Sequence, residues 1–177
     1  KWHTGVDKSM NLAFLPVETE EANKYTIEMQ YCIDFAFANR KLMMKNIQSV
    51  FSDVMGGKFR ELDFVNIAHN YAGWENHFGK NVLVHRKGAT SAREGETGII
   101  PGSQGTKSYI VKGKGNAESF TSCSHGAGRV MGRKQAQRTL DLKEEILQLD
   151  KQGIIHAIRT QRDLDEAPGA YKDINEV

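Results

Sequence analysis

Hydrophobic side chains recur at spacings of three and four from Ala22 to Val54, a pattern that predicts one long amphipathic helix. Thr19 is expected to cap its first turn, which carries two glutamates, and Gly56-Gly57 to end it. An interruption near Asn39 is also compatible with the pattern. The stripe of Met and Phe side chains fits a core-facing surface better than a cofactor site, because an amphipathic helix has such a stripe in any case.

The rest of the chain mixes short strand and helix patterns in no regular rhythm. Residues 62–74 are apolar but of uncertain type. Strands are predicted at 81–85, 108–111 and 154–158, and helices at 129–140 and from Asp141, with Glu144 as capping-box partner, to Gly153. This irregular order favours an α+β fold over a doubly wound sheet.

Length and composition suit one domain, or part of a larger one. The chain has 177 residues and a mass of 19.8 kDa, and it contains no apolar run of the ~18 residues that a membrane span needs. The opening KWHTGVDKSM has no apolar core typical of a signal peptide. Its 2 cysteines, Cys32 and Cys123, form no CxxC pair, which favours a reducing, cytoplasmic location.

Charge is distributed unevenly, although the net charge is only +2. Residues 80–140 hold eleven Lys or Arg against three Glu, a net +8, together with ten of the 17 glycines. Cations and exposed backbone N–H groups are what polyanion recognition requires. A solvated loop region with no ligand would have the same composition, so both interpretations stay open here.

The stretch HGAGR, which begins at His125, is the most chemically suggestive motif. Glycines on both sides of Ala127 let the backbone approach an anion, a helix starting at Arg129 would offer free N–H donors, and Arg129 supplies a bidentate fork. A neutral imidazole there could serve as nucleophile, metal ligand or general acid. Spacing alone equally allows a histidine that only hydrogen-bonds its own turn.

Two further glycine-containing loops lie nearby. In VHRKGA, Arg86 and Lys87 follow a predicted strand, and PGSQG adds a tight turn with the Ser103 hydroxyl. Each is a weak signal, but three such loops within ~45 residues suggest one phosphate site. His69, in IAHN, is compatible with a core histidine or a metal ligand. Walker A and G-x-S-x-G motifs are absent.

Four collinear segments together resemble the RtcB family of GTP-dependent RNA ligases. They are IAHNYAGWENHFGK, VHRKGATSAREG, GIIPGSQGTKSYIVKGKGN and SFTSCSHGAGRVMGR. LPVETEEANKYTIEMQYCIDFAFANRKLMM resembles the family's long helix, and PGAYKDINEV a stretch near its C-terminus. The resemblance covers the chain after about residue 12. It implies a mixed sheet with flanking helices, with the long amphipathic helix at the N-terminal side.

The resemblance also implies a reaction. A histidine–GMP phosphoramidate would form at His125 from GTP with Mn²⁺, and RNA 2′,3′-cyclic phosphate or 3′-phosphate ends would then be joined to 5′-hydroxyl ends. His69 would be a manganese ligand. Nucleotide or phosphate contacts are implied for Asn70, Arg86, Lys87, Ser103, Gly126, Ala127, Gly128, Arg129 and Tyr171. RNA is the implied partner, along with an archease-type activator protein.

Other metal ligands of the family do not match positions of this sequence. The family has an aspartate and a cysteine in a glycine-rich motif, and two further histidines. Glu75-Asn76-His77 resembles the family's Gly-Asn-His motif but lacks the glycine, so His77 is not counted. We therefore expect residues 1–177 to be a single domain or the C-terminal part of a larger catalytic domain. A non-catalytic RNA-binding module is the alternative.

Overall fold

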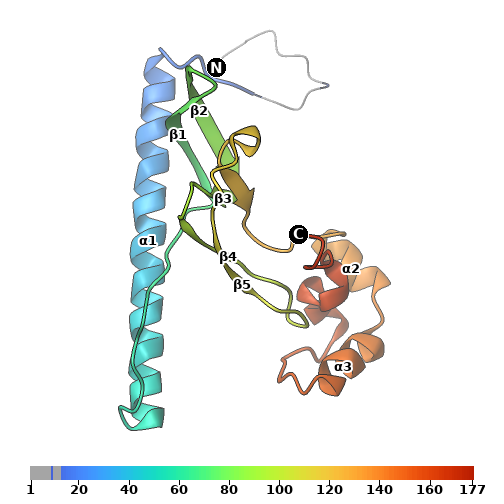
Figure 1. Cartoon of the computed structure of the whole chain (residues 1–177). Coiled ribbons are helices and arrows are strands. Elements are labelled where there is room, and N and C mark those ends of the chain that lie inside the picture. Colours follow the sequence, from blue (N-terminus) through green and yellow to red (C-terminus); the bar gives the residue numbers. More distant parts are fainter. Residues whose placement is uncertain (1–8, 10–12) are drawn as a thin grey trace. The chain divides into compact units, whose positions relative to one another are not determined.

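The computed structural model describes Ser9 and residues 13–177; the opening stretch, for which no signal peptide is expected, otherwise lies outside these residues. The chain divides into two compact units, Lys1–Leu62 and Asp63–Val177. Each is considered by itself below (Figure 1). No helix among the described residues combines the length and the apolar character that crossing a membrane would need.

The first unit is dominated by one α-helix, α1, Glu20–Met55. Its N-cap is Thr19, whose hydroxyl accepts a hydrogen bond of 3.2 Å from the Ala22 N–H. Gly56 ends the helix in the left-handed conformation, with φ of 58°. Both predicted ends are confirmed. The interruption considered near Asn39 does not occur, since the helix runs through it without a break.

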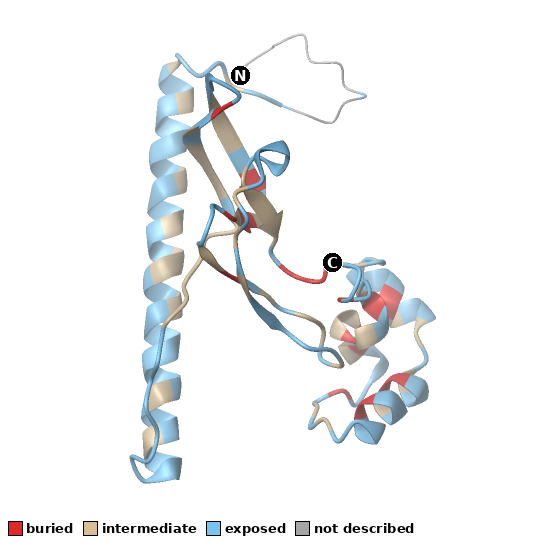
Figure 2. Ribbon diagram, viewed as in Figure 1, coloured by how far each residue is buried: buried red, intermediate tan, exposed pale blue. Residues whose placement is uncertain are grey.

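The apolar stripe of α1 is not a buried core surface. No residue of the helix is buried (Figure 2). Side chains such as Phe35 and Val54 are exposed. Within this unit, the Phe51 ring meets that of Phe59 edge-on at 6.2 Å, beyond the helix end. The expectation of a core-facing stripe is therefore not met by the unit alone, because one helix offers no second layer to cover it.

The second unit begins with an antiparallel hairpin of β1, Asn70–His77, and β2, Lys80–Lys87. The turn uses two residues at positive φ, Phe78 and Gly79. The register pairs Asn70 with Lys87 and His77 with Lys80. The predicted strand at 81–85 is thus confirmed and extended, and the segment of uncertain type ends in β1.

Two further ladders complete the strands. β3, Ala89–Ser91, pairs with β6, Ser122–Ser124, and β4, Thr97–Ile100, pairs with β5, Tyr109–Lys112. The α+β class and the long N-terminal helix are confirmed. The described strands form three separate antiparallel pairs, a more divided arrangement than the expected mixed sheet.

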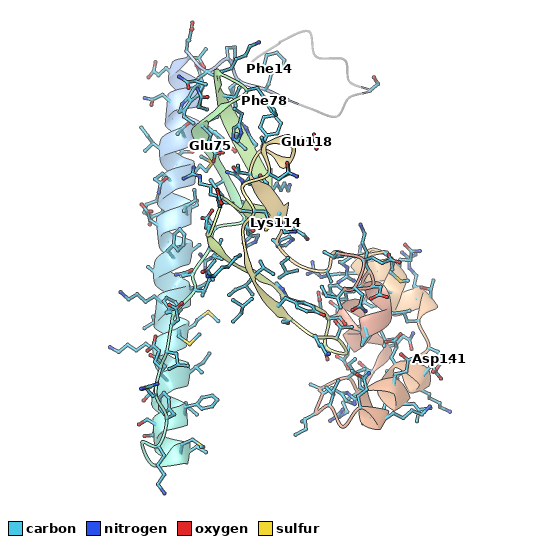
Figure 3. The ribbon with its side chains drawn as sticks, in the orientation of Figure 1. Phe14, Glu75, Phe78, Lys114, Glu118 and Asp141 are labelled. Atoms are coloured by element: carbon cyan, nitrogen blue, oxygen red, sulfur yellow. The ribbon has the colours of Figure 1, made fainter. Side chains whose placement is uncertain are left out.

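Two α-helices follow the strands: α2, Arg133–Thr139, and α3, Leu142–Lys151. Within residues 13–177 there are also three short 3-10 helices: η2, Ala117–Ser119, which precedes β6, and η3, Gln161–Glu166, and η4, Pro168–Ala170, which follow α3. The Asp141 side chain caps α3 as predicted, accepting from the Glu144 N–H at 2.9 Å (Figure 3). The hydrophobic core of this part joins Leu149, Ile158, Leu164 and Ala167.

Two sequence predictions fail in this part of the chain. Helix α2 starts at Arg133 rather than at residue 129, since the preceding segment turns to follow Tyr171 instead. Residues 154–158 form no strand, because no other described segment pairs with them; Ile158 packs in the core while Ile155 is fully exposed.

Candidate active site

Two histidines that are distant in the sequence meet in the second unit. His69 directly precedes β1 and His125 directly follows β6. Their imidazole rings are stacked, with centroids 5.0 Å apart and planes only 6° from parallel. His125 is exposed and His69 is half-buried. The fold thus brings together the expected nucleophile and the expected metal ligand, with the nucleophile open to solvent.

Gly88, directly after β2, lies close to both segments that carry these histidines. Its N–H donates to the His69 carbonyl at 2.8 Å and to the Asn70 Oδ1 at 3.1 Å. A Cβ at this position would lie 3.3 Å from the His125 Nε2, and φ is +67°. The backbone conformation therefore favours glycine here, and any side chain would also crowd the His125 ring. The Asn70 side chain thus binds the backbone N–H of Gly88.

The HGAGR and PGSQG loops also lie against each other. The Ala127 N–H donates to the Pro101 carbonyl at 2.9 Å, and the Ser124 hydroxyl donates to the Gly126 carbonyl at 2.5 Å. Gly128 has a positive φ of 72°, and its carbonyl accepts from the Lys172 N–H at 3.0 Å. The three glycine-containing loops therefore converge, as the sequence suggested.

The donors of these loops are less available than expected. The Ser103 hydroxyl lies 3.2 Å from the Thr106 Oγ1, and the Ser103 N–H donates to that same oxygen at 2.8 Å. Helix α2 begins only at Arg133, with Gly132 as its N-cap, so no helix of the described chain starts within the HGAGR loop. The expectation that a following helix supplies anion-binding N–H groups there is therefore wrong.

Arg86 is buried, with 2% of its surface exposed, and forms what we call the Arg86 cluster: Arg86, Glu75, Tyr71, Ser122 and the Phe120 carbonyl. Nη1 donates to the Tyr71 hydroxyl at 2.9 Å and Glu75 Oε1 at 2.6 Å. Nη2 donates to Glu75 Oε2 at 3.0 Å and the Phe120 carbonyl at 2.9 Å. Nε donates to the Ser122 Oγ at 2.9 Å.

A guanidinium has five N–H donors, and all five are used within the Arg86 cluster. The prediction that Arg86 contacts a phosphate is therefore not supported. Lys87, the next residue, is exposed at the end of β2, because successive strand residues face opposite sides. Of the two adjacent cations, only Lys87 is open to an anion.

Glu75 balances the buried charge of Arg86 (Figure 3). Hydrogen bonding to Arg86 lowers the pKa of Glu75 from 4.5 to about 2, against the opposing effect of burial. His77 Nε2 lies 2.8 Å from Glu75 Oε2, and the largely exposed Arg93 lies 3.4 Å from Glu75 Oε1. At neutral pH this is an ionised buried pair with satisfied hydrogen bonds.

Arg129 and Tyr171 form a second group, the Arg129 cluster, with Glu166 and Arg133. The Arg129 guanidinium stacks on the Tyr171 ring, with Cζ 5.0 Å from the centroid. Arg129 Nη2 donates to the Asp165 carbonyl at 2.5 Å, and Nη1 lies 3.4 Å from Glu166 Oε2. Side-chain exposure of 23% for Arg129 and 39% for Glu166 makes this cluster more open than the first.

Hydrogen bonding links the titrations of Tyr171 and Glu166. The Tyr171 hydroxyl donates to Glu166, and this bond, ahead of the contribution of Arg133, lowers the pKa of Glu166 despite partial burial. Burial, and then the same hydrogen bond, raises the pKa of Tyr171. Tyr171 and Arg129 therefore lie together and contact each other. Their implied contacts with a nucleotide stay a prediction.

The metal prediction can be tested against the side chains present. Among the residues that the structure describes, no group of three or more His, Cys, Asp or Glu side chains could hold a metal ion. At the candidate site, His69 and His125 bring two possible ligands together, and a transition metal is generally held by several protein ligands. The described residues therefore do not fit a manganese site by themselves.

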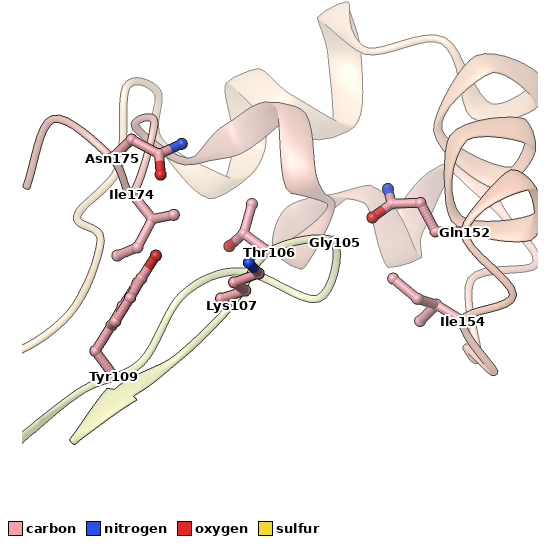
Figure 4. A pocket seen from close by; sticks show the side chains of 8 residues that line it. All are labelled: Gly105, Thr106, Lys107, Tyr109, Gln152, Ile154, Ile174 and Asn175. Atoms are coloured by element: carbon pink, nitrogen blue, oxygen red, sulfur yellow. The ribbon is translucent and has the colours of Figure 1, made fainter.

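A shallow cleft of about 450 Å³ lies close to the PGSQG loop but not at the histidines (Figure 4). It is lined by Gly105, Thr106, Lys107, Tyr109, Gln152, Ile154, Ile174 and Asn175. Neither His69 nor His125 is among these residues, so the cleft and the histidine pair are separate features.

Glycine-containing loops that converge near an exposed histidine are compatible with a protein that handles phosphate groups. Comparison with known proteins narrows this class. A family profile described as "tRNA-splicing ligase RtcB" matches residues 1–177. The chain belongs to the RtcB family.

Relatives from bacteria and archaea agree with this assignment. The chain is similar to the RNA-splicing ligase RtcB of Escherichia coli K12, with 41% identity over 96% of the chain. It is also similar to the tRNA-splicing ligase RtcB of Thermococcus kodakarensis, with 36% identity over 94% of the chain. The alignments cover 42% and 39% of these two relatives, so the chain spans about two fifths of their length.

Sequence reasoning missed the roles of Glu75 and Glu166. Glu75 sits in GWENH, where only strand alternation opposite VLVHRK could have indicated that it faces the same side as Arg86. Glu166 lies in a short helix and offers no local signal, because its partners Arg129 and Arg133 are more than 30 residues away.

Proposed function

We propose that this chain carries the nucleophile of an RNA ligase that joins 2′,3′-cyclic phosphate or 3′-phosphate ends to 5′-hydroxyl ends. The proposal rests on one observation within a member of the RtcB family: His125 is exposed in a glycine-rich loop and stacked 5.0 Å from His69. A histidine that served only its own turn would need neither the second imidazole nor the close approach of Gly88.

In the proposed first step, an imidazole nitrogen of His125 attacks the α-phosphorus of GTP. A nitrogen–phosphorus bond forms while the bond from the α-phosphorus to the bridging oxygen breaks, and pyrophosphate leaves with that electron pair. The exposed Lys87 lies at the strand end beside Gly88, where its charge would favour a phosphate. Arg129 and Tyr171 would bound the site at Gly128, with their mutual stacking limiting how far either can move.

GTP, Mn²⁺, the RNA ends and an archease-type activator remain predictions for the whole gene product, as does a cytoplasmic location. No step above depends on the metal, because the described residues of this chain do not form a site for it. We expect the whole gene product to bind Mn²⁺ and the present chain to bind it weakly. Isothermal titration of both polypeptides tests that difference.

The deciding experiment incubates the whole gene product with [α-³²P]GTP and MnCl₂, followed by denaturing gel electrophoresis. We expect an acid-labile radioactive adduct that His125→Ala abolishes and His69→Ala weakens. His85→Ala is the matched control, since this exposed histidine of β2 bonds the Leu83 carbonyl of its own strand and should label normally. Persistent label on His125→Ala would place the nucleophile elsewhere.

A non-catalytic RNA-binding module is the second candidate for the chain taken alone. The net +8 of residues 80–140 favours it, together with the presence of only two converging imidazoles among the described residues. It predicts that the isolated chain binds RNA with strong salt dependence and takes no GMP label. A robust adduct on the isolated chain would contradict this candidate.

A further inference from the structure

Arg86 connects the segments that carry both histidines. In the register of the hairpin, Arg86 of β2 lies opposite Tyr71 of β1, which is two residues after His69. Its guanidinium also packs over the Tyr71 ring, with Cζ 5.4 Å from the centroid, and donates to the Tyr71 hydroxyl. One end of the Arg86 cluster is therefore fixed to the strand that begins beside His69.

The other end of the cluster is fixed to the strand before His125. Arg86 Nη2 donates to the Phe120 carbonyl, and Nε donates to the Ser122 hydroxyl at the start of β6. Strand β6 has only three residues and ends at Ser124, next to His125. Such a short strand has few ladder bonds of its own. The two Arg86 bonds therefore add to the few others that hold this segment, such as the Thr90–Cys123 contact and the bond from the Ala92 N–H to the Thr121 carbonyl.

A third connection runs along β2 itself. Gly88 follows Arg86 by two residues, donates its N–H to the His69 carbonyl and lies close to the His125 ring. Ala89, the next residue, pairs with Ser124 in the β3–β6 ladder. A shift of β2 relative to β6 would therefore move both imidazoles with respect to each other.

From these contacts we propose that Arg86 is a positioning residue, whose guanidinium fixes β1 against β6 and so holds His69 and His125 in their stacked arrangement. The geometric claim depends on the contacts alone. Its consequence for catalysis rests on the proposed function above.

Lysine cannot replace Arg86 in this role. An ammonium has three donors around one atom, whereas the five bonds of Arg86 leave from three nitrogens in one plane and reach acceptors on β1, on β6 and in the segment before β6. Arg86→Lys keeps the charge beside Glu75 and so favours a folded protein, but it cannot span both strands.

The direct test is NMR spectroscopy of the whole gene product labelled with ¹⁵N-histidine. A stacked ring shifts the resonances of its neighbour, so His69→Ala first calibrates how far the His125 signals move when stacking is lost. We expect Arg86→Lys to reproduce at least half of that displacement, with unchanged circular dichroism. Ser122→Ala removes the Arg86 bond to β6, together with the bond that the Ser122 hydroxyl donates to the Phe120 carbonyl, and leaves the Arg86 bonds to Glu75, Tyr71 and the Phe120 carbonyl. It should give a smaller shift in the same direction.

Arg93→Gln is the matched control. Arg93 contacts the same Glu75 carboxylate at 3.4 Å, but its side chain is 65% exposed. Glu75 belongs to β1, so this contact does not connect β1 with β6. We expect its His125 signals to remain at the wild-type positions. The proposal would be overturned if the His125 signals were unchanged in both Arg86→Lys and Ser122→Ala while these variants are folded. It would also be overturned if Arg93→Gln shifted the His125 signals as far as Arg86→Lys does.

Catalysis provides a second measurement with a separate outcome. Displacing a reacting group by about 1 Å can cost on the order of 100-fold in rate. We expect Arg86→Lys to lower the rate of GMP transfer to His125 by about 10- to 100-fold at saturating GTP, with little change in KM. Raised KM at normal maximal rate would contradict positioning. Absence of label on the wild-type protein would refute the proposed function, while the NMR result would still decide the geometry.

Discussion

The Arg86 cluster and the Arg129 cluster start from similar sequence signals and reach different environments. Both arginines flank a glycine-rich loop, and the sequence predicts phosphate contacts for both. Arg86 is 2% exposed and uses every donor, with a carboxylate partner whose side chain is 8% exposed. Arg129 is partly open, stacks on Tyr171 and shares Glu166 with Arg133.

The difference follows from where each arginine sits in its backbone. Arg86 occupies an inward position of a strand, so its side chain enters the space between β1 and β6. Arg129 belongs to an irregular segment that makes a single bridge with Tyr171. Arg86 is thus a buried structural cation, whereas Arg129 is partly accessible. The alternation of inward and outward positions along β2 explains the burial of Arg86, and no such alternation applies to Arg129.

The largest effect should come from breaking the buried pair. We expect Arg86→Met to destabilise the fold by about 3–5 kcal/mol, because it leaves the buried Glu75 charge without its partner. Urea denaturation measures this loss. The double variant Arg86→Met/Glu75→Gln removes both charges and should recover part of it; a double variant no more stable than the single one would contradict this account.

Acid should reveal the same pair in the unsubstituted protein. The Glu75 pKa is about 2 in the fold and 4.5 for an unperturbed glutamate, so its contribution of about 3 kcal/mol is complete above pH 4.5. It is lost as the pH falls from there towards 2, when the carboxylate takes up a proton. We expect the stability difference between wild type and Glu75→Gln to shrink over that window. A constant difference in urea midpoints from about pH 6 to about pH 2.5 would rule this out.

The Arg129 cluster should tolerate substitution better. We expect Arg129→Met to cost about 1–2 kcal/mol, because partial exposure lets water replace some of its bonds. Thermal unfolding compares it with Arg86→Met under the same conditions. If the two losses were equal, exposure would not be what distinguishes the clusters.

Arg93 should show the smallest effect. Its ion pair with Glu75 is 3.4 Å long and its side chain is 65% exposed, so Arg93→Gln should change stability by about 0.5 kcal/mol or less. The same urea titration applies. A loss above about 1 kcal/mol would mean that Glu75 needs both arginines.

Sequence patterns predicted those features that depend on neighbouring residues. The limits of α1 follow from Thr19 and Gly56, and the cap of α3 follows from Asp141. The three glycine loops within ~45 residues suggested one phosphate site, which stays a prediction, and the two histidines singled out by the family resemblance, His69 and His125, do meet.

What sequence could not supply depends on contacts between distant segments. The burial of Arg86 requires Glu75, Ser122 and the Phe120 carbonyl, which become neighbours only when β1, β2 and β6 assemble. The late start of α2 depends on the bridge between Arg129 and Tyr171. The local helix and strand propensities of the sequence predict neither the burial of Arg86 nor the start of α2 at Arg133.

Gly88 offers a way to observe the site without perturbing it. Its amide proton is shared between the His69 carbonyl and the Asn70 side chain, at the point where the two histidine segments meet. Exchange of that proton with deuterium requires both acceptors to be released. The exchange rate of this one amide therefore reports how often Gly88 separates from the His69–Asn70 segment in the native protein, on a timescale that ring stacking in a static structure does not reveal.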